Sequence, residues 1–449
     1  MPAPAGASRV ASPAVVPRDA PASPLRRRLA AAGAGAGAGA LLALAGCAPA
    51  TPQPAPISTR SAPPARPGPA KAPAGPELAR YADTQGRFPR ATRANWNSPA
   101  ASVDGFSRLD EIFPANTSAR ASTPRPWRRP AAGTPVGAPV DDYLARNPVT
   151  GLLIAREEVI LAERYQYGRG EAHRFTSFSM AGGLLALMAG IALQERRLRL
   201  DDPAQLYVPA LAGSAYGATP VRHLLTMSSG LRPRDDLTAD DLDGMGLPGG
   251  WEVGGARAAR LYEERVAPPG ERWHPSVGDA FVLGLVLRAV AGQPLCDFFS
   301  DRVWKPIGAE ADASWILERG GQELGFTGFN AVLRDYGRLG AMLARQGRVD
   351  FRQVVSAAWL RELTRAQVGA RQTGRGWGYG YQSWVFAEND GSFAWLGERG
   401  QALMVDPARR LVLVQAAVRP QSRDGGLAET VALWQSLRRA HQPLRLPAG

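Results

Sequence analysis

RFTSFSMAGGLLALMAGIAL, residues 174–193, is the stretch that decides how this chain folds. From Ser179 onward, apolar side chains recur at three- and four-residue intervals, which predicts a helix that is stopped by Asp202-Pro203. Gly182 and Gly183 in the first turn each cost that helix about 1 kcal/mol relative to alanine. A serine at a helix start can be a cap or a nucleophile, and this stretch alone leaves both open.

The elements on either side of this helix predict an α+β domain. Two apolar runs before it form a predicted hairpin, and the segment after it is mostly helical until Gly374. Short apolar runs joined by Gly- or Asp-containing turns then indicate antiparallel strands, which we expect to share one sheet with the hairpin. The expected strands are 151–155, 159–165, 377–386, 393–396, 401–405 and 411–418, and the expected helices are 219–227, 281–291, 331–344 and 427–439.

Composition separates the first part of the chain from the rest. Of 39 prolines, 16 lie in the first 80 residues, and residues 1–140 carry a net charge of +11 against +2 for residues 141–449. A nucleic-acid partner requires a basic face on the folded part, so we expect none. The chain has only two lysines and two cysteines, which excludes a disulfide framework. Its four histidines show no paired spacing, so we expect neither a metal nor a cofactor.

The N-terminus has the order of an export signal. Arg26, Arg27 and Arg28 precede an apolar stretch, residues 29–45, and Leu44-Ala45-Gly46-Cys47 follows at its end. This resembles a bacterial lipoprotein signal, in which the cysteine becomes the lipidated first residue. An ordinary cleaved signal or an Ala-rich linker is the alternative.

This resemblance implies three segments. We expect a signal peptide over residues 1–47, a Pro/Ala-rich disordered tether over residues 48–94, and a folded domain over residues 95–449. Lipidated Cys47 would hold the protein at a membrane surface of the bacterial cell envelope, outside the cytoplasm.

Five stretches, taken in order along the chain, resemble a known family. They are residues 174–193, LDDPAQLYVPALAGSAYGATPVRHLLTMSSGL, VWKPIGAEADASWIL, GFNAVLRDYGRLGAML and GERGQALMVDPARRLVLV. They are similar to the serine hydrolases of the β-lactamase and penicillin-binding superfamily, and above all to its class C-like branch of esterases and nylon-oligomer (6-aminohexanoate-dimer) hydrolases. The resemblance implies a five-stranded antiparallel sheet flanked by helices, a mostly helical lobe, and a cleft for a small ester, amide or peptide-like ligand.

The resemblance also implies site residues, and two of them are replaced. Ser179 takes the nucleophile position, but Gly182 stands where the family has a lysine three residues later. Pro275 stands where the family has a tyrosine that exchanges protons with the serine and the leaving group. His274, next to it, is a substitute base or, more plainly, a loop histidine.

The third family feature is a glycine-containing strand edge, and this sequence keeps it as Gly397-Glu398-Arg399-Gly400-Gln401. Gly400 would let substrate lie against the strand, and Gln401 or Ala402 would offer an N–H group to an oxyanion. Arg399 would present a cation to a substrate carboxylate. The alternative is a tight turn with an exposed arginine.

These replacements predict an enzyme whose hydrolytic power is lost or greatly reduced. Removing both proton-transfer groups should cost on the order of 10³ to 10⁶ in rate. The prediction is therefore a pseudoenzyme or weak esterase. The rival is an active serine hydrolase in which Ser179 uses a non-standard base.

Overall fold

The computed structural model describes residues 75–131, 134–232, 259, 262–318, 321–387, 390–420 and 426–444. The predicted signal peptide, Cys47 and residues 48–74 of the predicted tether lie outside them.

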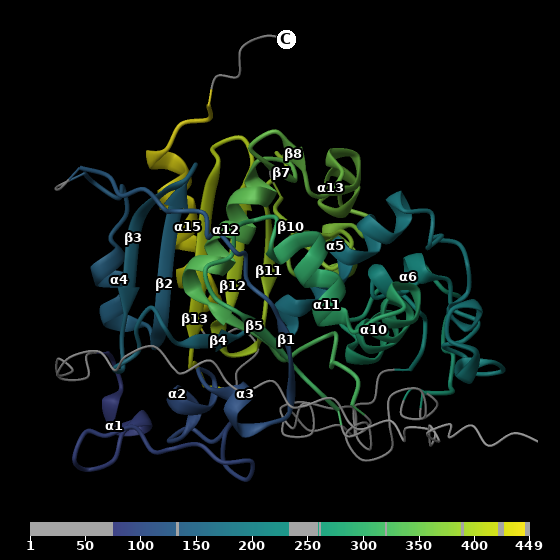
Figure 1. Cartoon of the computed structure of the whole chain (residues 1–449), viewed down its shortest axis with the longest axis horizontal. Coiled ribbons are helices and arrows are strands. Elements are labelled where there is room, and N and C mark those ends of the chain that lie inside the picture. The colour runs from purple at the N-terminus through teal and green to yellow at the C-terminus, as the bar shows by residue number, and fades with distance from the viewer. Residues whose placement is uncertain are drawn as a thin grey trace, which may run out of the picture. The chain divides into compact units, whose positions relative to one another are not determined.

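A seven-stranded antiparallel sheet forms the centre of the α+β fold (Figure 1), in the order β3-β2-β13-β12-β11-β10-β9. Its strands are β2 (Val149–Arg156), β3 (Val159–Tyr165), β9 (Gly378–Tyr379), β10 (Trp384–Val385), β11 (Phe393–Leu396), β12 (Ala402–Asp406) and β13 (Leu411–Ala417). The early hairpin joins the late strands as predicted, because β2 pairs with β13. The sheet has two strands more than the resemblance implied. Compared with the six strands expected from the sequence the increase is one, because β9 and β10 replace the single strand expected over residues 377–386, which a turn at residues 380–383 interrupts.

The two faces of this sheet bury alternate side chains of each strand. Leu153 and Ala155 belong to the core under α12 (Leu333–Ala344). Leu152 and Ile154 face the opposite way, into a second core covered by α4 (Val140–Arg146) and α15 (Leu427–Ala440). Both faces are thus covered, as a sheet with this pattern requires.

A mostly helical lobe lies beside the sheet (Figure 1). Its main helices are α5 (Ala181–Gln194), α6 (Val221–Leu225), α10 (Val277–Ala291), α11 (Leu295–Phe299) and α13 (Ala357–Leu363). Helix α5 ends earlier than the sequence pattern predicted, because Arg196 adopts a left-handed backbone conformation with φ 59°.

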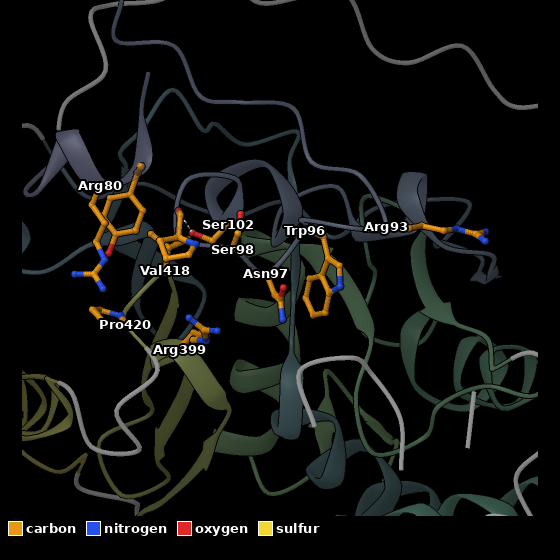
Figure 2. A pocket seen from close by; sticks show the side chains of 11 residues that line it. Arg80, Arg93, Trp96, Asn97, Ser98, Ser102, Arg399, Val418 and Pro420 are labelled. Atoms are coloured by element: carbon orange, nitrogen blue, oxygen red, sulfur yellow. Dashed lines mark hydrogen bonds between the residues drawn. The ribbon is translucent and has the colours of Figure 1, made fainter. Parts of the chain in front are cut away.

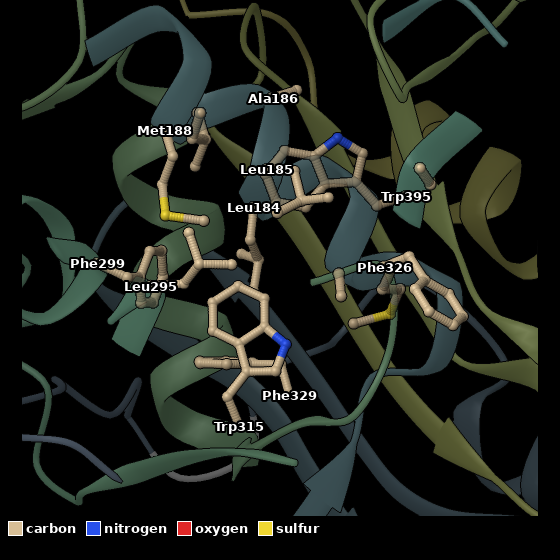
Figure 3. Close-up of a cluster of buried hydrophobic side chains, with 14 of the residues drawn as sticks. Leu184, Leu185, Ala186, Met188, Leu295, Phe299, Trp315, Phe326, Phe329 and Trp395 are labelled. Carbon is tan, nitrogen blue, oxygen red and sulfur yellow. The ribbon is translucent and has the colours of Figure 1, made fainter. Parts of the chain in front are cut away.

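Helix α5 is buried on all sides, which explains why its sequence is almost wholly apolar. Leu184 and Met188 lie in a cluster with Phe299 and Trp315 (Figure 3), and all four are at most 2% exposed. Burying one such leucine contributes about 1.5–3 kcal/mol. Among the described residues no single helix is long and apolar enough to span a membrane; α10 with the segment Leu295–Trp304 reaches that length only as a pair bent by 74°.

A second, four-stranded sheet was not predicted. Its order is β1-β5-β6-β4, from β1 (Ala115–Ser118), β5 (Ala313–Ile316), β6 (Phe329–Val332) and β4 (Arg174–Thr176). Strand β4 leads directly into the 3-10 turn η1 (Phe178–Met180), so this sheet sets the position of Ser179. The other elements of the described residues are η2 (Ala204–Leu206), η3 (Pro209–Leu211), η4 (Ser300–Trp304), β7 (Arg348–Val349), β8 (Arg352–Gln353), α14 (Ala370–Thr373) and η5 (Glu398–Gly400).

The folded part begins earlier than residue 95. Short helices α1 (Leu78–Tyr81), α2 (Ser102–Gly105) and α3 (Leu109–Ile112) form an N-terminal segment. Tyr81 is only 1% exposed, and its ring centroid lies 5.5 Å from that of Tyr167. Ala91 donates its N–H to the carboxylate of Asp104 at 2.8 Å. Residues 75–94 are therefore part of the fold and not of a tether, because aromatic side chains anchor them.

Candidate active site

Ser179 lies at the junction between η1 and α5, where the sequence placed it. The preceding residue, Phe178, has φ 45°, a left-handed conformation that costs a non-glycine residue roughly 1–3 kcal/mol. Its ring packs edge-on against Phe106, with 5.0 Å between centroids, and stacks on Trp96 at 6.3 Å. Two aromatic rings of the N-terminal segment thus hold the strained backbone that presents Ser179.

The carboxylate of Glu398 holds Ser179, a contact that no sequence pattern indicated. The hydroxyl of Ser179 donates to Glu398 Oε1 at 2.6 Å, and the backbone N–H of Ser179 donates to Glu398 Oε2 at 3.1 Å. Glu398 opens the turn η5 between β11 and β12 and is exposed. Replacement of the family's lysine and tyrosine therefore does not leave Ser179 without an ionisable neighbour, because the fold brings to it a side chain 219 residues away.

Gly397 makes this contact possible. A Cβ at this position would overlap the carbonyl oxygen of Ser177, so only glycine lets the turn approach the serine this closely. Gln401 fixes the far side of the turn: with its amide nitrogen facing inward, it donates to the carbonyl oxygen of Glu398 at 3.0 Å and to that of Ala417 at 3.3 Å. The backbone of Glu398 is held, while its carboxylate remains accessible to solvent.

The start of α5 favours negative charge at this point. Unsatisfied N–H groups and the helix dipole place partial positive charge at a helix N-terminus, which stabilises a carboxylate or an oxyanion there. Glu398 can accordingly cap the helix, accept the proton of Ser179, or do both. Because it also occupies the N–H of Ser179, it competes with any substrate oxygen for that donor.

Gly182 lies against a glutamine side chain. A Cβ at position 182 would be 2.5 Å from Gln382 Oε1, so the amide of Gln382 fills the space into which a side chain would project. Gln382 is 5% exposed, has φ 53°, and donates from Nε2 to the carbonyl oxygens of Leu224 and Leu225 at 3.1 and 3.2 Å. The missing lysine is therefore accompanied by a neutral amide packed beside its position.

The segment that carries Pro275 also carries Trp273, whose ring packs against Tyr379. Pro275 is exposed, while the backbone N–H of His274 donates to the carbonyl oxygen of Met227 at 3.0 Å. The ring of Trp273 lies 5.5 Å from that of Tyr379. Among the described residues, Ser179 forms its side-chain hydrogen bond with Glu398 and not with this segment.

The phenol of Tyr379 lies next to Gln382. Its hydroxyl lies 3.5 Å from Gln382 Oε1 and 3.4 Å from the sulfur of Met227. Burial raises the pKa of Tyr379 well above its usual range, so its hydroxyl keeps its proton at neutral pH. No spacing in the sequence indicated this residue, which lies in a two-residue strand.

The roles predicted for two residues after Glu398 need correction. A Cβ on Gly400, whose φ is 95°, would lie 2.9 Å from Cδ of Arg419, so packing against Arg419 and not a substrate demands this glycine. The backbone N–H of Gln401 donates to Glu398 O at 3.3 Å and its side chain is buried, so it serves the turn and does not face a ligand. Arg399 adopts φ 62° and carries its guanidinium to 5.8 Å from the ring of Phe106, toward the N-terminal segment.

A buried acid lies at the start of α10. Asp279 accepts hydrogen bonds from the hydroxyls of Ser229, Tyr216 and Ser276 at 2.7 to 3.0 Å and from the N–H of Ser229 at 3.1 Å. Burial raises its pKa to about 6, and these four donors offset only part of that effect. Ser276 caps the helix by accepting the N–H of Asp279 at 3.1 Å. Across the described part of the chain, no group of three or more His, Cys, Asp or Glu side chains could hold a metal ion.

Comparison with known proteins decides the family. The model of the family described as Beta-lactamase matches residues 140–434, more than half of the chain. The chain belongs to the beta-lactamase family. It is thus a β-lactamase-like serine hydrolase by family, and the α+β fold predicted from the sequence is confirmed.

Individual relatives agree with this family. The 6-aminohexanoate-dimer hydrolase of Paenarthrobacter ureafaciens is 24% identical over 364 residues, which cover 77% of this chain and 92% of that protein. A Bacillus anthracis structure named for the same hydrolase has a TM-score of 0.69 at 20% identity, covering 78% of this chain and 96% of its own. A penicillin-binding protein from Bacillus halodurans has a TM-score of 0.52 at 16% identity, covering 66% and 98%. These two structures show that the fold of the beta-lactamase family extends over most of the described residues.

Proposed function

We propose that this member of the beta-lactamase family is an acyl-serine hydrolase for esters, with Ser179 as nucleophile and Glu398 as the group that takes its proton. The observation that supports the proposal is the 2.6 Å hydrogen bond from the hydroxyl of Ser179 to the carboxylate of Glu398. A positioned nucleophile with a base in hydrogen-bond reach is the arrangement that covalent catalysis needs.

The proposed reaction has two halves. The Ser179 oxygen bonds to the acyl carbon of the ester while its proton passes to Glu398, and the intermediate then releases the alcohol, which takes that proton back. In the second half a water molecule attacks the acyl-serine, Glu398 accepts the water's proton, and the carboxylic acid leaves as the proton returns to Ser179. Before the first step, the carboxylate must give up the N–H of Ser179, so that this N–H can bind the developing oxyanion.

Leaving-group chemistry limits the substrates. Gly182 and Pro275 stand where the family carries a lysine and a tyrosine, so the leaving group receives its proton from Glu398 alone. General acid-base assistance is worth about 10² to 10⁴ in rate. We therefore expect turnover of esters with good leaving groups and little turnover of unactivated amides, including the 6-aminohexanoate dimer for which the Paenarthrobacter relative is named.

A second candidate is the predicted pseudoenzyme, a protein that binds an ester-, amide- or peptide-like ligand without cleaving it. Its support is that Glu398 engages both polar groups of Ser179, the hydroxyl and the N–H, and so occupies the position of a substrate oxygen. In this alternative Glu398 is a helix cap that blocks the site.

One set of variants separates the two candidates. Hydrolysis of p-nitrophenyl acetate and labelling by a fluorophosphonate are measured for the wild type, Ser179→Ala, Glu398→Gln and Glu398→Ala. If Glu398 is the base, both Glu398 variants lose about 10²-fold or more in kcat/KM, and Ser179→Ala abolishes labelling. Glu362→Gln, an exposed glutamate on α13, is the matched control and should retain full activity.

The opposite results have separate meanings. A gain in turnover or labelling on removing the Glu398 carboxylate would mean that it blocks the serine. Absence of any Ser179-dependent reaction in all variants would leave the ligand-binding candidate.

We further propose that the protein is exported and held at a bacterial membrane by lipid on Cys47. The support is the order of three arginines, an apolar stretch and Leu44-Ala45-Gly46-Cys47. Incorporation of radiolabelled palmitate and partitioning into detergent are expected for the wild type. Persistence of both in Cys47→Ala would exclude this anchor.

A further inference from the structure

One aromatic ring of the N-terminal segment contacts both sides of the candidate catalytic pair. Phe106, which directly follows α2 and is 3% exposed, packs edge-on against Phe178 with 5.0 Å between ring centroids. The guanidinium carbon of Arg399 lies 5.8 Å from the centroid of the same ring. Phe178 directly precedes Ser179, and Arg399 directly follows Glu398. A single side chain thus bridges the neighbours of the nucleophile and of the carboxylate that holds it.

The two chain segments that this ring contacts are adjacent to each other. The carbonyl oxygen of Phe106 accepts the N–H of Thr176, the last residue of β4, at 2.9 Å. A Cβ added to Gly397 would lie 3.2 Å from Cβ of Phe178, so the turn η5 and the backbone before the serine nearly touch. A shift of either segment therefore changes the distance between the serine and the carboxylate.

Phe106 is itself held in place by its own neighbours. The carboxylate of Asp104 accepts hydrogen bonds from Nε and Nη2 of Arg108 at 2.8 and 2.7 Å, and from the N–H of Ala91 at 2.8 Å. Charge-assisted hydrogen bonds of this kind are the strong ones. The indole of Trp96, also 3% exposed, lies 5.8 Å from the ring of Phe106. The N-terminal segment can therefore present this ring at a fixed position.

Open space beside the ring gives the turn η5 room to shift when the contact is lost. A cavity of ≈ 580 Å³ lies between residues 80–102 and residues 399–420, and both Trp96 and Arg399 line it (Figure 2). Close packing restricts the movement of most buried side chains. Arg399 instead borders both this space and the ring of Phe106. Loss of the ring would thus leave the turn less restricted than in a filled interior.

We propose that Phe106 is a positioning residue, whose ring keeps the Ser179 hydroxyl and the Glu398 carboxylate at hydrogen-bond distance. The proposal rests on the hydrolysis proposed above, because that distance sets a rate only if the serine reacts. Phe106 acts through Phe178 and Arg399 and takes no part in the bond changes. Misplacing a reacting group by about 1 Å can cost on the order of 10²-fold in rate. The effect therefore belongs in kcat and not in KM.

Phe106→Leu tests this role, because it keeps an apolar side chain and removes the ring from both contacts. For p-nitrophenyl acetate we expect kcat to fall at least tenfold while KM changes less than twofold. Phe88→Leu is the matched control, the same change at another ring of the N-terminal segment, which lies 5.9 Å from that of Tyr167. It should retain the kcat of the wild type.

Combination with Glu398→Gln separates positioning from a general loss of stability. If Phe106 acts by placing the carboxylate, the two changes are not additive, and Phe106→Leu should lower kcat less than threefold in the Glu398→Gln background. The same fold-loss in both backgrounds would overturn the proposal, since a general structural defect does not depend on the carboxylate.

Crystal structures of the wild type and of Phe106→Leu test the geometry without turnover. We expect the 2.6 Å hydrogen bond between Ser179 and Glu398 in the wild type, and a separation above about 3.5 Å in the variant. An intact bond in the variant would overturn the positioning role. A separated pair in the variant, with no Ser179-dependent turnover in the wild type, would overturn the proposed hydrolysis alone. Thermal unfolding establishes that each variant is folded, and Phe106→Met replaces Phe106→Leu if that variant is not.

Discussion

At the scale of single residues, Glu398 and Ser179 form a pair with two incompatible functions. The carboxylate accepts hydrogen bonds from the hydroxyl and from the N–H of Ser179. In the proposed mechanism the first bond activates the hydroxyl, whereas the second occupies the N–H that a substrate oxygen needs. Gln401 holds the backbone of Glu398 while the carboxylate stays exposed. A rotation of the carboxylate alone can therefore release the N–H and keep the hydroxyl.

Gly182→Lys alone should not restore the family's amine. Because Cβ of the new side chain would lie 2.5 Å from Gln382 Oε1, the lysine cannot take its place while that amide is present. Gly182→Lys with Gln382→Ala should raise kcat/KM for p-nitrophenyl acetate at least tenfold above either single variant, and adding Pro275→Tyr should raise it further. Gln382→Ala is the control. A full gain from Gly182→Lys by itself would show that Gln382 moves aside freely.

At the scale of elements, aromatic rings explain two of the three glycines of α5, Gly183 and Gly190. A Cβ on Gly183 would overlap the indole of Trp395, and one on Gly190 would overlap the indole of Trp359. Trp395 is held in turn by its Nε1 hydrogen bond to Ser383 at 2.8 Å. Glycine lowers the helix propensity at these two positions, but it lets strand β11 and helix α13 pack closely against α5.

Gly183→Ala should therefore destabilise the protein although alanine is the better helix former. Overpacking against Trp395 costs about 1–3 kcal/mol, which exceeds the gain of about 1 kcal/mol in helix propensity. Urea unfolding measures the difference. Gly182→Ala is the matched control, since its Cβ meets only the end of the Gln382 side chain and should cost less. Equal stability of both variants would contradict this explanation of Gly183.

Sequence patterns predicted the elements whose side chains alternate or recur regularly. Strand 393–396 and strand 159–165 agree with the structure to the residue. Strands β5 and β6 were missed because they are four residues long and buried on both faces, so no alternation marks them. Glu398 was missed for a different reason. It is an exposed acid in a turn, and its role arises from a contact between residues 219 positions apart, which no local pattern contains.

At the scale of the whole molecule, burial shifts the pKa values of two groups in opposite directions, and the stability of the fold depends on pH through both. Burial raises the pKa of Asp279 to about 6, so the native state keeps a proton on this group that the unfolded state loses above about pH 4. The contribution of Asp279 to stability is therefore lost as pH rises above about 4. His173 has its pKa lowered to about 4 by burial, so its contribution is lost as pH falls below 6.5. Over the same acid range the two effects partly cancel.

Asp279→Asn should remove one of these opposing effects. The unfolding free energy of the wild type minus that of the variant should fall by about 2–3 kcal/mol as pH rises from about 4 to about 6, at 1.36 kcal/mol for each pKa unit. Denaturant unfolding at several pH values measures this difference. Asp142→Asn, on the exposed side of α4, should give a constant difference. A pH-independent result for Asp279→Asn would mean that the buried acid keeps its unfolded-state affinity for protons.

The strained backbone at Phe178 has a consequence for protein engineering. Trp96 and Phe106 hold this residue from a region of the chain that the matched family residues 140–434 do not include. A chimaera that joins residues 140–434 to the N-terminal segment of another protein would lose the packing of these two rings on Phe178. The backbone that positions Ser179 would then no longer be held. A transfer of the candidate active site to another protein must therefore include Trp96 and Phe106.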